Sequence, residues 1–379
     1  MLKPFLKWPG GKSDELEIIH KNMPNNIRDY IEPFLGGGAC LLSLTQDKYR
    51  MAYANDLASE LIDFYNMIKE KNERFFRYTL DIWNYWESME YCSEELYETI
   101  RVIYKEYKEN ISPDKDKVLK QQVNQLVEDN LQLLLRKLPD SLKVDEKRLV
   151  SEFNKSILSK LKNINRKEKK DGDLPEEDYK ENFEAGIRAS LYTYYRYLYN
   201  QKKKYILQRE LCIALFFYLR EFCYSSMFRY NSKGEFNVPY GGLSYNRKNF
   251  LLKIEYIQSD IVQASLAEME FRNQDFEIFV NQLILEYDDF MFLDPPYDSD
   301  FSTYANNTFD RDDQVRLANY LINECPCRFM LIIKNTDFIA ELYEGEENIY
   351  IRGFDKDYKV SFMDRNDKKV KHLMITNYL

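Results

Sequence analysis

Residues 28–56, RDYIEPFLGGGACLLSLTQDKYRMAYAND, contain the pattern that decides the fold. RDYIEPF (28–34) is a short apolar run typical of a strand, three glycines follow it, and ACLLSLTQ (39–46) is a helical run. MAYAND (51–56) is a second strand, and the apolar residues of LASELIDFYNMIKE (57–70) recur at helical spacing. This order of strand, helix and strand is a βαβ unit, which predicts a parallel sheet.

The C-terminal part of the chain shows the same alternation. FMFLDPPY (290–297), RFMLIIKN (328–335) and KHLMITNY (371–378) are short runs typical of strands, and RDDQVRLANYLINE (311–324) is an amphipathic helix. We therefore predict an α/β protein whose Rossmann-like sheet is built from both ends of the chain, residues 1–70 and 255–379.

The middle of the chain has a different character, because it is highly charged, rich in tyrosine and nearly free of glycine. The apolar stripe of VNQLVEDNLQLLLRKL (123–138) predicts one helix that Pro139 ends, and LVSEFNKSILSKLKNI (149–164) predicts a second. The charged run NRKEKKDGDLPEEDYKEN (165–182) predicts a loop or linker.

These features predict a mainly helical domain, residues 71–254, inserted into the α/β domain. Within it, residues 80–200 form an extra helical segment.

The composition indicates the cellular compartment and argues against membrane segments, zinc sites and disulfide bonds. No run of about 18 apolar residues is present, and the N-terminus lacks the apolar core of a signal peptide, so we expect a cytoplasmic protein with no membrane partner. Six cysteines without C-x-x-C spacing and two histidines encode neither a zinc site nor a disulfide framework. We expect no metal, and reduced, buried thiols.

FLKWPGGKSDEL (5–16) ends in Gly-Lys-Ser, as a phosphate-binding loop does. That loop also needs a glycine five residues before its second one, and this position is Leu6. Only ten residues precede Gly11, and two prolines interrupt them, which leaves little room for the strand that such a loop follows. The segment is therefore not expected to belong to a nucleotide triphosphatase.

Two features stand where ligands bind in open α/β sheets, at the carboxyl ends of the strands. The first is the glycine turn Phe34-Leu35-Gly36-Gly37-Gly38, where the backbone can approach a ligand closely. The second is Asp56 at the end of the next strand, an acid that can accept hydrogen bonds from ribose hydroxyls. These two features alone fit a nicotinamide enzyme equally well.

Asp294-Pro295-Pro296-Tyr297, at the end of another strand, discriminates between these chemistries. Two prolines remove two backbone donors, so the carbonyls there stay free to accept hydrogen bonds beside a carboxylate and an aromatic face. The arrangement suits an aromatic amine such as N6 of adenine. With both N–H groups bonded, the nitrogen can present its lone pair to an electrophile, while Tyr297 stacks on the base.

Five motifs follow one another along the chain. They are Lys7-Trp8-Pro9-Gly10-Gly11-Lys12, Glu32-Pro33-Phe34-Leu35-Gly36-Gly37-Gly38, Ala54-Asn55-Asp56, Phe228-Arg229-Tyr230-Asn231 with Gly234-Glu235-Phe236-Asn237-Val238-Pro239-Tyr240-Gly241, and Asp294-Pro295-Pro296-Tyr297. Together they resemble the S-adenosylmethionine-dependent DNA adenine-N6 methyltransferases of the Dam-like, alpha-ordered class. The resemblance covers roughly residues 3–70 and 205–379. The segment 80–200 is much longer than is usual in this family, and it could read additional DNA, mediate oligomerisation or bind a partner protein.

The resemblance implies S-adenosyl-L-methionine as cofactor and assigns roles to individual residues. The cofactor-binding residues that it implies are Trp8, Lys12, Phe34, Gly36, Asp56, Asp260 and Asp294. Asp56 holds the ribose, and Asp260, in YIQSDIV, ends the strand that borders the cofactor's adenine. Asp294, Pro295 and Tyr297 are the implied catalytic residues, with Asp294 between the cofactor and the target amine.

The same resemblance makes residues 228–243 a β-hairpin that enters double-stranded DNA. Its expected DNA-binding residues are Arg229, Tyr230, Asn231, Lys233, Asn237 and Tyr240. Although the net charge of the chain is −9, the stretch 225–253 carries five basic residues against one acidic residue. The target adenine must be flipped out of the duplex to meet a buried sulfonium.

Several alternatives stay open at this point. The clamp recognises an amine, so N4-cytosine or RNA adenine methylation also fits, and a catalytically inactive DNA-binding specificity subunit is a further possibility. Pro326-Cys327 resembles the nucleophile dipeptide of cytosine-C5 methyltransferases, but its position indicates a structural cysteine. A restriction-modification or phage/host methylation context, a cognate restriction endonuclease and a monomer or dimer are compatible with the sequence, and GATC is a plausible recognition site.

Overall fold

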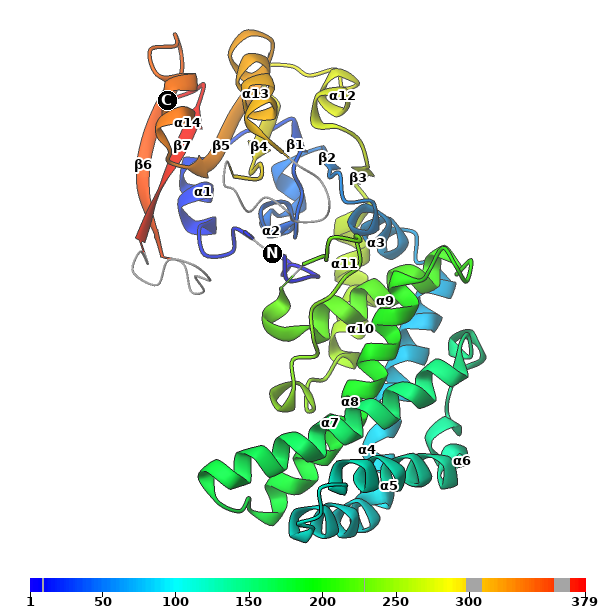
Figure 1. The fold of residues 1–379 in the computed structure, drawn as a ribbon. Coiled ribbons are helices and arrows are strands. Elements are labelled where there is room, and N and C mark those ends of the chain that lie inside the picture. Colours follow the sequence, from blue (N-terminus) through cyan, green and yellow to red (C-terminus); the bar gives the residue numbers. More distant parts are fainter. Residues whose placement is uncertain (9, 228, 298–308, 358–368) are drawn as a thin grey trace. The chain divides into compact units, whose positions relative to one another are not determined.

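The computed structural model describes residues 1–8, 10–227, 229–297, 309–357 and 369–379. These residues divide into two compact units (Figure 1). The sheet unit contains Met1–Glu70 and Ile257–Leu379, and the helical unit contains Lys71–Tyr256. The boundaries expected from the sequence were residues 1–70 with 255–379, and residues 71–254.

The sheet unit is built on seven strands in the order β3-β2-β1-β4-β5-β7-β6. They are β1 (Asp29–Glu32), β2 (Met51–Asn55), β3 (Met269–Arg272), β4 (Phe290–Leu293), β5 (Arg328–Lys334), β6 (Tyr350–Asp357) and β7 (Lys369–Thr376). The first five pair in parallel, whereas β7 runs antiparallel to both β5 and β6. The prediction of a Rossmann-like α/β sheet is confirmed.

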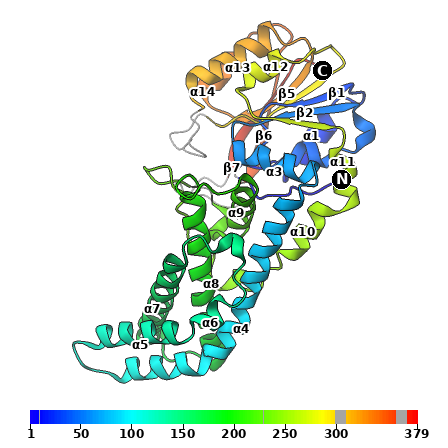
Figure 2. The ribbon, with the colours of Figure 1, turned by 90° about the vertical axis from the view of Figure 1, so that its right-hand side faces the viewer.

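Seven helices belong to the described part of the sheet unit. They are α1 (Leu16–Asn22), α2 (Ala39–Ser43), α3 (Ser59–Lys69), α11 (Asp260–Leu266), α12 (Phe276–Asn281), α13 (Arg311–Asn323) and α14 (Asp337–Tyr343). Figure 2 shows α13 and α14 on one face of the sheet, and α1 and α3 on the other. Because both faces are covered, β1 and β4 are buried along their whole length, and β4, FMFL, reads as a continuous apolar run.

The strand order reverses between β1 and β4, because the chain moves outward through β2 and β3 and then returns to the other side of β1. Such a reversal leaves a crevice beyond the carboxyl ends of the two strands, where open α/β sheets bind their ligands. The glycine turn follows β1, and Asp294 follows β4 directly. The two motifs that the sequence singled out therefore flank this crevice.

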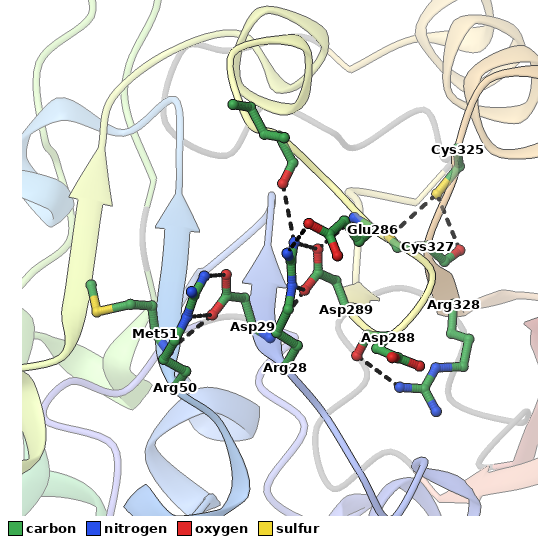
Figure 3. A network of polar contacts seen from close by, with 11 residues as sticks. Arg28, Asp29, Arg50, Met51, Glu286, Asp288, Asp289, Cys325, Cys327 and Arg328 are labelled. Carbon is green, nitrogen blue, oxygen red and sulfur yellow. Dashed lines mark hydrogen bonds and ion pairs between the residues drawn. The ribbon is translucent and has the colours of Figure 1, made fainter.

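The amino ends of the strands are closed by paired charges (Figure 3). Arg28 donates from Nε and Nη2 to the two carboxylate oxygens of Asp289, at 2.7 and 2.6 Å. Arg50 forms the same two-pronged pair with Asp29, at 3.0 and 2.5 Å. Bidentate pairs of this kind fix geometry as well as charge, and Asp289 is fully buried. The network joins the starts of β1, β2 and β4, at the edge opposite the crevice.

The helical unit is an assembly of long and short helices (Figure 1). They are α4 (Glu73–Glu109), α5 (Lys115–Asp129), α6 (Leu131–Leu135), α7 (Glu146–Asp171), α8 (Glu176–Asn200) and α9 (Arg209–Phe222), with α10 (Leu251–Gln258) at the boundary of the unit. Buried tyrosines join them: the hydroxyls of Tyr85, Tyr194 and Tyr195 donate to backbone carbonyls of neighbouring segments at 2.6–3.3 Å. Across the described residues, no helix has both the length and the apolar character needed to cross a bilayer.

Two predictions for this unit are wrong. The single helix expected over residues 123–138 is divided at Asn130 into the end of α5 and the short α6. The charged run 165–182, expected as a loop, is mostly helix, since α7 continues to Asp171 and α8 begins at Glu176.

The reason for the second error is a charge that is buried rather than solvated. Glu168 accepts hydrogen bonds from the Tyr104 hydroxyl at 2.6 Å and from the Leu174 N–H at 3.0 Å, and Lys108 lies 3.0 Å away. These partners lower the pKa of Glu168 to about 2 despite its burial. An acid held in this way anchors the last turns of α7, so the charged run stays helical.

Candidate functional site

Lys12 and Asp294 form an ion pair at the carboxyl end of β4. The ammonium of Lys12 also donates to the Tyr297 hydroxyl at 3.0 Å and to the Gly10 carbonyl at 3.3 Å. Lys12 is only 2% exposed, so a fully shielded cation holds the carboxylate and the phenol in one orientation. The structure thus brings together three residues that the sequence had assigned to cofactor binding and catalysis.

The segment around Trp8 lies against the glycine turn. A Cβ placed on Gly36 would be 3.0 Å from Cδ1 of Trp8, and a Cβ on Gly37 would be 3.0 Å from Cβ of Trp8. Gly36 also has a φ of +51°, which favours glycine. The turn can therefore pass close to the half-buried indole only because it lacks side chains. This contact explains why the first motif and the glycine turn belong to one site.

Asp56 fixes the other side of the same turn. One of its carboxylate oxygens accepts from the Gly36 N–H, and the other accepts from the Ala58 N–H, each at 2.9 Å. Desolvation raises the pKa of Asp56, whereas these two N–H groups act in the opposite direction. Each oxygen keeps a further lone pair, so the carboxylate can accept additional hydrogen bonds from a bound ligand. Phe34, before the turn, packs against Phe276 and Phe309 at ring distances of 5.5 and 5.4 Å.

Only one of the two proline carbonyls expected to stay free is a candidate acceptor for a substrate amine. The Pro296 carbonyl accepts from Nε2 of the buried Gln314 at 2.8 Å, so the expectation is wrong for this atom. Gln314 projects from α13 and fixes the path of the chain after β4. Pro295 remains the carbonyl assigned to the substrate.

Glu32 is a buried acid beside the site that sequence reasoning missed. It ends β1 and is 2% exposed, and its Oε2 accepts from the Tyr30 hydroxyl at 2.8 Å and from the Leu41 N–H at 3.1 Å. Burial, followed by the negative charges of Asp294 and Asp56, raises the pKa of Glu32 to about 8, although the two hydrogen bonds oppose the shift. The signal available in the sequence was an acid at the end of a strand, directly before the glycine turn.

Glu32 predicts a specific dependence of stability on pH. The folded-state pKa lies above the ordinary value of 4.5, so Glu32 is neutral in the folded protein over a range where the unfolded chain ionises it. Its contribution to stability is complete below about pH 4.5 and decreases as the pH rises to about 8. This contribution is absent in Glu32→Gln. The free energy of unfolding of the variant minus that of the parent should therefore rise by about 1.4 kcal/mol per pH unit between about pH 4.5 and pH 8. Urea denaturation at several pH values measures the difference, and a difference independent of pH would contradict the assignment.

Asp260 does not end a strand, so its predicted place in the sheet is wrong. It is the exposed first residue of α11. The error arose because YIQSDIV spans the junction of two short helices, whose buried residues Ile257 and Val262 look like an apolar strand when read together. On the side away from β1, β2 pairs with β3. The carboxyl end of β3 is followed by Asn273, Gln274 and Asp275. No signal in the sequence separated the two acids except that Asp275 follows the β-rich run MEFR.

Residues 229–241 form a hairpin that is closed by an isolated antiparallel bridge between Tyr230 and Phe236. A second bridge joins Tyr240 of the hairpin to Cys223 at the end of α9. The backbone N–H of Asn231 donates to the Glu235 carbonyl at 2.9 Å, and Gly234, with a φ of +72°, closes the turn. Phe228 and Pro9, which belong to two of the sequence motifs, lie outside the described residues.

The predicted DNA-binding residues divide into two groups. Arg229 and Lys233 are exposed, and Nε of Arg229 donates to Oδ1 of Asn237 at 3.1 Å. Asn231 is used inside the hairpin, because its Oδ1 accepts from the N–H groups of Lys233 and Glu235 at 2.9 and 3.0 Å.

The two tyrosines of the hairpin also make internal contacts. The ring of Tyr240 packs against Trp86 at 5.5 Å, and its hydroxyl donates to Asn246 at 2.8 Å. Tyr230 is half-buried and rests edge-on against Phe236 at 6.0 Å. Tyr240 and Asn231 thus hold the shape of the hairpin, while Arg229, Lys233 and part of Tyr230 remain accessible.

A further exposed aromatic residue lies beside the hairpin and was not singled out from the sequence. Tyr224 is 49% exposed, and its N–H donates to the Pro239 carbonyl at 2.9 Å. The next two residues, Ser225 and Ser226, have φ values of +51° and +52°, a conformation that costs about 1–2 kcal/mol for each non-glycine residue. Strained residues of this kind cluster at active sites, ligand clamps and switch regions.

Among the described residues, no group of three or more histidine, cysteine or acidic side chains is placed to hold a metal ion. Cys327 is fully buried at the start of the β5 segment, away from the carboxyl ends of the strands. It therefore lies at the opposite end of the strands from Asp294.

Comparison with known proteins identifies the family. Residues 8–189 and 157–354 match the D12 class N6 adenine-specific DNA methyltransferases, and the chain belongs to this family. It is 28% identical to the Type II methyltransferase M.MjaIII of Methanocaldococcus jannaschii, over 91% of this chain and 89% of that protein. It is 22% identical to the Type II methyltransferase M1.LlaDCHI of Lactococcus lactis, over 100% and 96%, and 23% identical to a DNA adenine methylase of Vibrio cholerae, over 91% and 86%. The resemblance inferred from the motifs is confirmed.

Proposed function

We propose that this protein is a site-specific DNA methyltransferase that transfers a methyl group from S-adenosyl-L-methionine to N6 of a flipped-out adenine in duplex DNA. The observation that carries the proposal is the placement of Asp294 and Tyr297, at the carboxyl end of β4, on the same buried ammonium of Lys12. Family membership supports the reaction, and the cofactor and the residue roles are inferred from the site.

The residues at the crevice fit the cofactor. The Asp56 carboxylate holds the turn through the Gly36 N–H and keeps lone pairs for the hydroxyls of a ribose. Trp8 and Phe34 supply apolar surface beside them. When bound, S-adenosyl-L-methionine supplies an electrophilic methyl group on its sulfonium. The protein itself supplies position and a shielded surrounding, which are large contributions to such a transfer.

The clamp acts on the amine of the target base. The Asp294 carboxylate and the Pro295 carbonyl accept its two N–H bonds, which draws the nitrogen toward a tetrahedral geometry and exposes its lone pair. Asp294 is also placed to receive the proton that the amine loses. Tyr297 is fixed for stacking by the Lys12 bond and by an edge contact with His372 at 5.5 Å. No covalent enzyme intermediate is needed.

We assign the contact with double-stranded DNA to the hairpin of the helical unit. Exposed Arg229 and Lys233 can reach phosphates or guanine edges, and half-buried Tyr230 and exposed Tyr224 offer rings where a base leaves the stack. Because Asn231 and Tyr240 are engaged within the unit, their contribution is to hold the hairpin in shape. Base readout is then carried mainly by side chains that project from it.

The combined replacement Arg229→Ala and Lys233→Ala should weaken DNA binding by roughly 10- to 100-fold at moderate salt. Two lost phosphate contacts would also reduce the slope of log K against log salt by about 2. Fluorescence anisotropy with a duplex at several salt concentrations measures both quantities. Lys105→Ala is the control, because it removes an exposed positive charge from α4, outside the hairpin. It should leave the slope unchanged. An unaltered slope in the double variant would remove the hairpin from the interface.

A second experiment compares the contributions of Asp275 and Asp260 to cofactor binding. We infer that Asp275, beyond the end of β3, borders the adenine of the cofactor, the place first assigned to Asp260. Asp275→Asn, which keeps a helix-capping side chain for α12, should raise the dissociation constant for S-adenosyl-L-methionine about 10-fold. Asp260→Ala should change this dissociation constant less than about twofold, since the Asp260 side chain is exposed. Calorimetric titration of the two variants decides between them, and the reverse ranking would restore Asp260.

The decisive test of the function is sequencing of genomic DNA after expression in a host without DNA methylation. Modified adenine in one recurrent motif would establish the reaction, the base and the recognition site together. Modified cytosine would instead establish the N4-cytosine alternative. Absence of any modified base would favour an RNA substrate, a missing partner or a binding role. GATC as recognition site, a companion endonuclease and a cytoplasmic location stay predictions.

A further inference from the structure

Two thiols lie close together at the amino edge of the sheet unit, away from the methyl-transfer site. The sulfur atoms of Cys325 and Cys327 are 3.6 Å apart, and the Cys325 thiol also reaches the Cys327 carbonyl at 3.6 Å (Figure 3). Both residues immediately precede β5, which pairs in parallel with β4 from Arg328 onward. They are therefore at the opposite end of the strands from Asp294.

The backbone explains why the two sulfurs face one another. Pro326 fixes its own φ and biases Cys325 toward an extended conformation, and in extended chain the side chains of residues i and i+2 point to the same side. Neighbouring bonds anchor both ends: the Cys325 N–H donates to the Tyr320 carbonyl at 2.9 Å, and Asn377 donates to the Cys327 carbonyl at 2.9 Å. The thiols must approach by only about 1.5 Å to reach the length of a disulfide bond.

Cys325 is more accessible and more reactive than Cys327. Cys327 is fully buried, whereas Cys325 is partly exposed and can meet a small oxidant. The hydrogen bond from Cys327 lowers the pKa of the Cys325 thiol, which favours the thiolate that reacts. The other four cysteines, Cys40, Cys92, Cys212 and Cys223, are buried in other elements.

We propose that Cys325 and Cys327 form a reversible disulfide when the protein meets a peroxide. The Cys325 sulfur attacks one oxygen of hydrogen peroxide, the O–O bond breaks, and a sulfenic acid and one water result. The Cys327 thiol then attacks the Cys325 sulfur, the S–O bond breaks, and a second water leaves with the thiol proton. Two thiols are oxidised by two electrons, and one peroxide is reduced to two waters. A dithiol such as dithiothreitol reverses the bond by exchange.

Peptide mapping tests this proposal directly, because trypsin cleavage after Arg316 and Arg328 releases residues 317–328, LANYLINECPCR, with both cysteines and no others. The folded protein is treated with equimolar hydrogen peroxide, then unfolded in iodoacetamide and digested. We expect this peptide to lose two hydrogens and take up no alkyl group, while the peptides of the four other cysteines are fully alkylated. Dithiothreitol before alkylation should return a doubly alkylated peptide.

Two controls isolate the geometry of the folded chain. In Cys327→Ser, the disulfide cannot form, and a sulfenic acid at Cys325 should be trapped by dimedone. In urea, where the hydrogen bonds to Tyr320 and Asn377 are lost, equimolar peroxide should oxidise the peptide at least several-fold more slowly. Double alkylation after peroxide treatment of the folded protein would overturn the proposal, as would a sulfinic acid at Cys325 beside an alkylated Cys327. The measurement needs neither DNA nor cofactor, so it is independent of the proposed methyl transfer.

Discussion

Replacement of Asp294 by alanine should abolish methyl transfer while DNA binding remains within about threefold of that of the parent protein. The carboxylate is assigned to the amine of the target base, so its loss removes both a hydrogen-bond acceptor and the group that takes the proton. A positioned acid or base group of this kind contributes roughly 10²- to 10⁴-fold to a rate. The hairpin residues assigned to DNA lie in the other unit and are unchanged.

The same substitution removes the carboxylate that forms the ion pair with the buried ammonium of Lys12, which can itself destabilise the fold. Asp294→Asn is therefore the second variant, because its side chain preserves the shape and one acceptor oxygen next to Lys12. Single-turnover transfer of labelled methyl groups, duplex binding by anisotropy and circular dichroism are measured on both proteins. Loss of transfer with intact folding and binding supports the assigned role. Equal loss of transfer and binding would show that Asp294 acts on DNA or on structure instead.

Features tied to strand ends could be predicted from the sequence because they depend on local patterns. The glycine turn after β1 and the acid after β4 follow short apolar runs, and the carboxyl ends of parallel strands meet at one edge of a sheet. Asp56 follows β2 directly, at the strand end expected from the sequence, and its carboxylate accepts a hydrogen bond from the Gly36 N–H of the turn.

Features that depend on long-range burial could not be predicted from the same patterns. The pairing of Lys12 with Asp294 joins residues that are distant in the chain, and nothing in their spacing reveals it. Glu168 lies in a run of charges, and the run is helical where Glu168 is buried against the Tyr104 hydroxyl and the Lys108 ammonium. Asp260 shows a third limit, because two short helices with buried aliphatic residues share the composition of a strand.

Gly38→Ala is expected to have the largest effect on stability among single methyl additions in the sheet unit. Gly38 has a φ of +64°, which disfavours alanine, and an added Cβ would lie 2.6 Å from the Tyr65 hydroxyl oxygen. Tyr65 cannot withdraw easily, because it is fully buried, its ring stacks on Phe271 at 4.9 Å, and its hydroxyl donates to the Gly37 carbonyl at 2.9 Å. The backbone and steric costs together predict a loss of about 2–4 kcal/mol in the free energy of unfolding.

Gly345→Ala separates the two costs, because Gly345 also has a positive φ, +82°, but an added Cβ would meet no atom within 4 Å. Its expected loss is about 1 kcal/mol, measured, as for Gly38→Ala, by hydrogen exchange of amides in the sheet unit. In a Tyr65→Phe background, which removes the obstructing oxygen, Gly38→Ala should cost little more than Gly345→Ala does. A coupling near zero in this double-mutant cycle would contradict the steric explanation. Because Gly38 caps α2 and ends the turn that faces the crevice, Gly38→Ala should also weaken cofactor binding, whereas Gly345→Ala should not.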